Sequence, residues 1–90
     1  MHPDFMKSMK NNGELEFLRA EALTGLTFSR IALGSHYQDK KDRNRINARK
    51  AYDCLLRFMP RDDATSEVLR GIKAKIAELK SLLQQLGEEV

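Results

Sequence analysis

The chain has 90 residues, of which 41% are hydrophobic and 32% are charged, and its formal net charge is +3. This length supports one small domain with a single core, and the composition is that of a globular protein rather than a disordered or membrane-embedded one. Because Cys54 is the single cysteine, the chain cannot form an internal disulfide, which favours a reducing compartment such as the cytoplasm. No uncharged stretch approaches the length of a bilayer span.

The first helix is expected over 13–33, after a flexible arm formed by residues 1–12. Asn11 and Glu14 fit a capping box at its start, and Gly34 fits a left-handed terminator at its end. Two apolar stripes follow the helical period. One contains Leu15, Leu18, Ala22, Leu26 and Ser29, and the other contains Phe17, Thr24, Phe28 and Ile31. So wide an apolar face predicts that this helix packs against both of the others.

The second helix is expected over 40–59, with Asp39 as its N-cap. Pro60 ends it, because the residue before a proline disfavours the helical conformation. The residues at helical spacing that supply its core face are Ala48, Ala51, Tyr52, Leu55, Phe58 and Met59.

The third helix is expected over 64–87, with Asp62, Asp63, Thr65 and Ser66 as capping and dipole-compensating residues. Its apolar residues form a heptad seam, with Leu69, Ile76, Leu83 and Val90 at the a positions and Ile72, Leu79 and Leu86 at the d positions. The favoured interpretation is that this seam docks on the first two helices of the same chain. The alternative is a homodimer formed through the seam over 69–90.

These patterns predict an all-α fold, a three-helix up-down-up bundle over residues 13–90. The residues expected to be mostly buried are Leu18, Leu26, Phe28, Ile31, Tyr52, Leu55, Phe58, Ile72, Ile76, Leu79 and Leu83.

Three short patterns resemble a tetratricopeptide repeat: Gly25-x-x-Phe28 in the first helix, Ala48-x-x-x-Tyr52 in the second, and Pro60 after it. The sequence departs from the family at Glu21 and Thr24, where Trp and Leu are usual, and the stretch between Phe28 and Ala48 is about eleven residues longer than the family spacing. The resemblance implies an elongated helical hairpin, capped by the third helix, that binds a protein partner. It also implies that Gly25 admits a close helix crossing opposite Ala48 or Tyr52.

No catalytic or cofactor motif is recognisable. The chain has no glycine-rich phosphate loop, no Cys-x-x-Cys and no nucleophile elbow, and its two histidines lack neighbouring metal ligands at a suitable spacing. We therefore expect a non-enzymatic protein without a cofactor or a metal.

A basic cluster, six of the eleven residues over 40–50, stands at the start of the second helix. Its members are Lys40, Lys41, Arg43, Arg45, Arg49 and Lys50. Cations at this end oppose the helix dipole, so helix stability does not explain them. The cluster is interpreted either as a solvated surface or as a partner-binding site. The expected partner is a protein, and the alternative is a nucleic acid whose phosphates these side chains contact.

Overall fold

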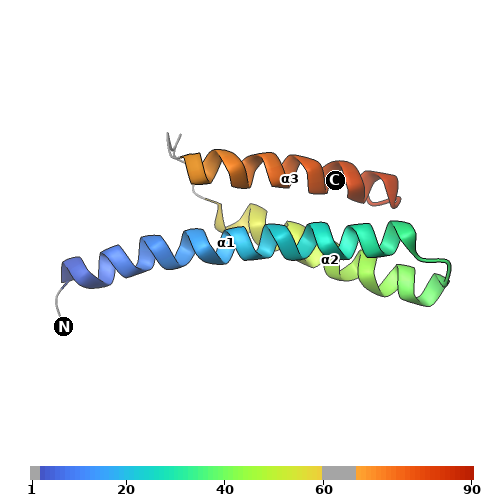
Figure 1. Cartoon of the computed structure of the whole chain (residues 1–90), viewed down its shortest axis with the longest axis horizontal. Helices are drawn as coiled ribbons and strands as arrows, with labels where there is room; N and C mark the ends of the chain where they lie inside the picture. The colour runs from blue at the N-terminus through green and yellow to red at the C-terminus, as the bar shows by residue number, and fades with distance from the viewer. Residues whose placement is uncertain (1–2, 60–66) are drawn as a thin grey trace.

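The computed structural model describes residues 3–59 and 67–90, and these form three α-helices and no strand. The helices are α1 (Pro3–Gly34), α2 (Gln38–Phe58) and α3 (Glu67–Gln85). They run up, down and up, so that neighbours in the chain are antiparallel (Figure 1). Helix α1 packs against both of the others, whereas α2 and α3 touch each other less. The predicted all-α three-helix bundle is confirmed.

The predicted start of the first helix is wrong. Helix α1 begins at Pro3, so the expected flexible arm is helical from residue 3 onward, and residues 1–2 lie outside the described residues. A helical period of apolar residues indicates that one face of a helix is buried. Residues 3–12 lack this period, but a helix with no buried face can still form there. This stretch contains several good helix formers and no interior proline or glycine, and proline is favoured at the first helical position. Asn11 is consequently inside α1 and is not its N-cap.

The connection between α1 and α2 also differs from the expectation. Gly34 is the last residue of α1 and is not left-handed, since Gly87 is the only glycine with a positive φ in the described part of the chain. The Oγ of Ser35 accepts the backbone N–H of Tyr37 at 3.3 Å, and Tyr37 is the extended N-cap residue of α2. Asp39 therefore does not cap α2 but lies in its first turn, where the helix dipole favours a carboxylate.

Helix α2 ends near the predicted position. Its C-cap, Met59, has extended backbone angles (φ −65°, ψ 131°), as expected of a residue that precedes a proline. The capping residues predicted before α3, Asp62 to Ser66, lie outside the described residues.

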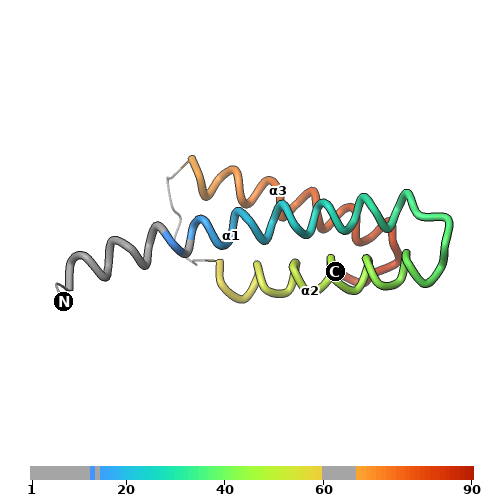
Figure 2. Tube along the Cα trace, turned by 60° about the horizontal axis from the view of Figure 1, so that its bottom comes forward, coloured from blue at the N-terminus to red at the C-terminus, as the bar shows by residue number. Residues whose placement is uncertain are grey.

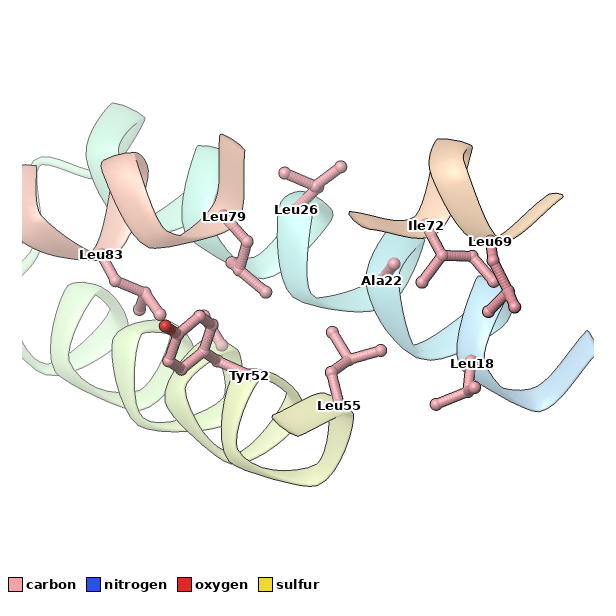
Figure 3. Packing of buried hydrophobic residues seen from close by; sticks show 10 residues of the cluster. Leu18, Ala22, Leu26, Tyr52, Leu55, Leu69, Ile72, Leu79 and Leu83 are labelled. Atoms are coloured by element: carbon pink, nitrogen blue, oxygen red, sulfur yellow. The ribbon is translucent and has the colours of Figure 1, made fainter. Parts of the chain in front are cut away.

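The core lies between the three helices and consists mainly of leucine and alanine (Figure 3). Seven of the residues predicted to be buried are buried: Leu18, Leu26, Tyr52, Leu55, Ile72, Leu79 and Leu83. Phe28 and Ile76 are half-buried. The prediction is wrong for Ile31 and Phe58, which are 39% and 56% exposed.

A row of small residues lets α1 approach its neighbours closely. The buried members of α1 are Ala22, Gly25, Ser29 and Ala32, and those of α2 are Ala48 and Ala51. A Cβ added at Gly25 would lie 3.2 Å from the Cβ of Ala51 and 2.7 Å from the Cδ2 of Leu79. The expected close crossing at Gly25 is therefore present, with Ala51 rather than Ala48 or Tyr52 beneath it and α3 as a second neighbour.

The heptad seam of α3 packs inside the chain. Leu69, Ile72, Leu79 and Leu83 are at most 7% exposed, and Ile76, Leu86 and Val90 are partly buried against the same core. A homodimer through these residues would require the bundle to open.

Candidate functional site

The chain turns sharply after α3. Gly87 has a φ of 91°, the N–H of Glu88 donates to the carbonyl of Leu83 at 2.9 Å, and the N–H of Gly87 donates to the carbonyl of Gln84 at 3.0 Å. These two bonds define a Schellman motif, which needs a left-handed residue at the position of Gly87. The turn carries Glu88 away from α3 and toward α2 (Figure 2).

Glu88 connects this turn to the basic cluster. Its carboxylate, with the side chain only 15% exposed, forms ion pairs with Arg45 and with Arg49, the latter at 3.0 Å. Arg49 also donates to the carboxylate of Asp53 at 3.0 Å, and hydrogen bonds to Asp53 and Glu88 raise the pKa of Arg49 above its ordinary value. We call Arg45, Arg49 and Glu88 the C-terminal clip.

The structure therefore divides the predicted basic cluster into two groups. Arg45 and Arg49 belong to the C-terminal clip and hold the end of the chain against α2. Lys40, Arg43 and Lys50 are exposed, and Lys41 is half-buried. Of the six basic residues, Lys40, Arg43 and Lys50 are thus the ones exposed to a partner of opposite charge.

The second apolar stripe of α1 is the other candidate surface. Ile31 is 39% exposed, Phe28 is half-buried, and Phe17, which is 46% exposed, meets Phe58 of α2 edge to face with the ring centroids 6.1 Å apart. We define the apolar stripe as Phe17, Thr24, Phe28 and Ile31 of α1 together with Phe58 of α2. Sequence analysis identified the α1 residues as a stripe but assigned them to helix packing.

The apolar stripe runs along the α1–α2 junction on the side away from α3. Arg30 lies on the α3 side of α1, because it donates to Glu78 at 2.9 Å. Positions 17, 24, 28 and 31 follow the helical period and lie on a different face from 30. Phe17 marks the α2 side through its contact with Phe58.

Beside Phe58, an open surface hollow of about 230 Å³ is lined by residues of α2: Lys50, Asp53, Cys54, Arg57 and Phe58. The half-buried Cys54 thiol lies between polar neighbours there. Burial raises its pKa, and the nearby Glu21 raises it further, while Arg57 acts in the opposite direction. A raised pKa keeps the thiol protonated and therefore weakly nucleophilic at neutral pH.

Within 3–59 and 67–90, no group of three or more His, Cys, Asp or Glu side chains is arranged to hold a metal ion. None of the three helices, over the residues that the structure describes, is long and apolar enough to cross a membrane.

Comparison of the chain with known protein families, with curated proteins and with solved structures gave no significant match. Functional inference therefore depends on the surface just described.

Proposed function

We propose that this chain is a non-enzymatic protein-interaction module that binds its partner along the apolar stripe. The observation that carries the proposal is the pairing of Phe17 and Phe58, two aromatic rings that remain 46% and 56% exposed although they touch each other. Exposed large apolar groups are ordinary when they stand singly, but a contiguous patch is typical of an interaction site.

The distribution of the other exposed apolar residues supports this choice. Leu23 is 47% exposed on α1, but it lies on a different face from Phe17 and Ile31 by helical spacing. Ile46 and Leu56 of α2 and Val68 of α3 are similarly exposed. The apolar stripe combines several exposed side chains from two helices along one junction.

The resemblance to a tetratricopeptide repeat is compatible with this function. In such repeats a helical hairpin is held close by small residues and leaves one face for a neighbour or a partner. Gly25 beside Ala51 supplies the close crossing, and α3 covers one side of the hairpin. The opposite side carries the apolar stripe.

Nucleic-acid binding through the basic cluster is the second candidate. It is less favoured, because Glu88 already neutralises Arg45 and Arg49 within the chain. Tyr37, 73% exposed beside the cluster, could stack on one base, although the stacking platforms of single-strand binders use several aromatic residues.

The test uses peptides selected from a random display library against the folded chain. Their affinities are then measured by calorimetry for the parent, Ile31→Ser and Leu23→Ser. The proposal predicts a loss of about tenfold or more with Ile31→Ser, because a large apolar side chain that anchors an interface is worth more than about 1.4 kcal/mol. Leu23→Ser is the matched control on the same helix and should bind as the parent does.

Equal binding by the parent and Ile31→Ser would contradict the proposal. Nucleic acid is tested separately, with single-stranded and duplex oligonucleotides over a range of salt concentrations. Steeply salt-dependent binding that is lost in Lys40→Glu/Arg43→Glu would support the second candidate instead.

A further inference from the structure

We infer that the partner segment seated on the apolar stripe is an amphipathic helix with an acidic edge. This inference rests on the proposed function and adds to it the conformation and charge of the partner. It follows from the geometry of the stripe and from a row of cations beside it.

The geometry of the stripe favours a helix as its occupant. Ile31 lies fourteen residues after Phe17 on α1, so the stripe is about 21 Å long at 1.5 Å per residue. A partner helix of about four turns has a similar length, and it presents apolar side chains along one face where the spacing i, i+3, i+4 and i+7 is repeated. An extended strand would instead need an edge of unpaired backbone groups, and the backbone of α1 and α2 is already paired within the helices.

A row of cations runs along the α2 side of this surface. Arg43, Lys50 and Arg57 are spaced by seven residues on α2, so they lie on one face, and all are exposed. None of them forms an ion pair with another side chain over 15–59 and 67–90, where the structure describes the side chains. Lys50 and Arg57 also line the hollow that Phe58 borders. We call these residues the cation row.

The other side of the apolar stripe offers no comparable charge. By helical spacing, the α1 positions that flank it there are Glu16, Ala20 and Thr27; all three are exposed, and of these Glu16, beside Phe17, carries a charge. Two carboxylates lie near the cation row: Glu21 is half-buried beside Cys54, and Asp53, which lines the hollow with Lys50 and Arg57, is paired with Arg49 at 3.0 Å. The surface is therefore apolar in the middle, cationic on one edge and, except for Glu16 at its end, neutral on the other.

This charge pattern identifies the matching partner. A helix with carboxylates at i and i+7 along one edge places an anion opposite each cation while its apolar face covers the stripe. A second copy of this chain, docked through the same surface, would bring its own cation row and no row of carboxylates spaced by seven residues. A polyanion would satisfy the cation row but would leave the apolar stripe uncovered.

The test uses two synthetic peptides of about eighteen residues, long enough for the four turns that the stripe accommodates. Both carry leucine at the same helical positions, and one carries glutamate along the edge where the other carries lysine. Binding to the full chain is measured by calorimetry, and the contacted residues are mapped by amide chemical shifts. We expect the acidic peptide to bind at least about tenfold more tightly, with shifts centred on Phe28, Ile31, Cys54 and Phe58.

Charge reversal on the protein tests the assignment of the cation row. Lys50→Glu/Arg57→Glu should exchange the preference, so that the lysine peptide binds more tightly. Lys73→Glu/Lys80→Glu is the matched control, because both lysines are exposed on α3 and the net charge changes equally. This control should keep the preference for the acidic peptide.

The outcomes separate the inference from the proposed function. If both peptides bind equally and Ile31→Ser abolishes that binding, the apolar site stands and the acidic partner is wrong. If neither peptide binds while library-selected peptides do, the helical acidic partner is likewise wrong. If the chain self-associates and Ile31→Ser abolishes that association, the stripe binds a second copy of the chain. If the chain binds heparin but neither peptide, and Lys50→Glu/Arg57→Glu abolishes heparin binding, the cation row binds polyanions. Either result overturns the inference.

Discussion

Gly25 lies in the middle of α1, where glycine is about 1 kcal/mol less favourable than alanine for helix stability. It packs directly against the side chains of Ala51 and Leu79. A leucine side chain there would have to displace both neighbours. We expect Gly25→Leu to lower the free energy of unfolding by about 1–3 kcal/mol despite the better helix propensity of leucine, because overpacking costs more than propensity restores. Urea denaturation followed by circular dichroism measures the change.

Gly71 provides the matched control for Gly25. It lies inside α3, and a Cβ added there meets nothing within 4 Å. Gly71→Ala should therefore raise the free energy of unfolding by about 0.5–1 kcal/mol, because alanine has the higher helix propensity and no packing is disturbed. A Gly25→Leu variant as stable as the parent would mean that α1 is not held as closely to α2 and α3 as we describe.

Ser29 belongs to the same row of small residues and is fully buried, and its Oγ has no hydrogen-bond partner among the described residues. Ser29→Ala should raise the free energy of unfolding by about 1 kcal/mol or more, since it removes an unsatisfied hydroxyl and improves helix propensity. Ser81→Ala, at an exposed position of α3, should gain only the propensity term of about 0.5 kcal/mol. Equal gains in the two variants, measured by urea denaturation, would show that the Ser29 hydroxyl is satisfied in solution.

Among the elements, the turn after α3 and its C-terminal clip link the segment after α3 to the middle of α2. Glu88→Gln should lower the free energy of unfolding by about 1 kcal/mol at low salt, because it removes the charge that Arg45 and Arg49 share. Glu89→Gln is the control, since Arg49 contacts the backbone carbonyl of Glu89 at 3.3 Å and the substitution leaves that carbonyl in place. A loss that is equally large for both variants, or that persists in high salt, would contradict a specific ion-pair clip.

The C-terminal clip also changes how the basic cluster should be tested. Reversing Arg45 or Arg49 would place two anions against each other at Glu88, so lost binding could reflect lost structure. Reversals at Arg43, Lys50 and Arg57 leave the C-terminal clip intact. They are the appropriate variants for partner binding.

The sequence predicts the buried face of α3 correctly and that of α2 only in part, for a physical reason. The heptad seam was located correctly, because a long periodic run allows only one buried face. Leu55 and Phe58 lie on neighbouring parts of one face of α2, and both were expected to be buried, yet only Leu55 is covered. Periodicity gives the direction of a face but not its width, which depends on how far the next helix extends over it.

The sites depended on contacts that local patterns do not encode. Gly87 signalled the end of α3, but nothing near Glu88 in the sequence indicates that its partners are Arg45 and Arg49, some forty residues earlier. The basic cluster was visible from its composition, whereas its division into a structural and an available group required the fold. The apolar stripe was visible as a period and was interpreted as core, because sequence alone does not show that α3 covers only one side of the hairpin.

At the scale of the whole molecule, the three helices cover the heptad seam internally and leave the apolar stripe uncovered. The apolar side chains that would drive a coiled-coil dimer, Leu69, Ile72, Leu79 and Leu83, already contribute to the core. We therefore expect the chain to sediment as a monomer of 10.3 kDa and its Tm to be independent of protein concentration.

The alternative dimers give distinguishable results in the same measurement. A dimer through the heptad seam would couple association to folding, so its Tm would rise with concentration and Leu79→Ser would abolish association and folding together. A dimer through the apolar stripe would instead dissociate in Ile31→Ser while the helical signal remained, because Ile31 is 39% exposed and contributes little to the core. Sedimentation equilibrium of the parent and of these two variants, each paired with its circular dichroism spectrum, decides among the three states.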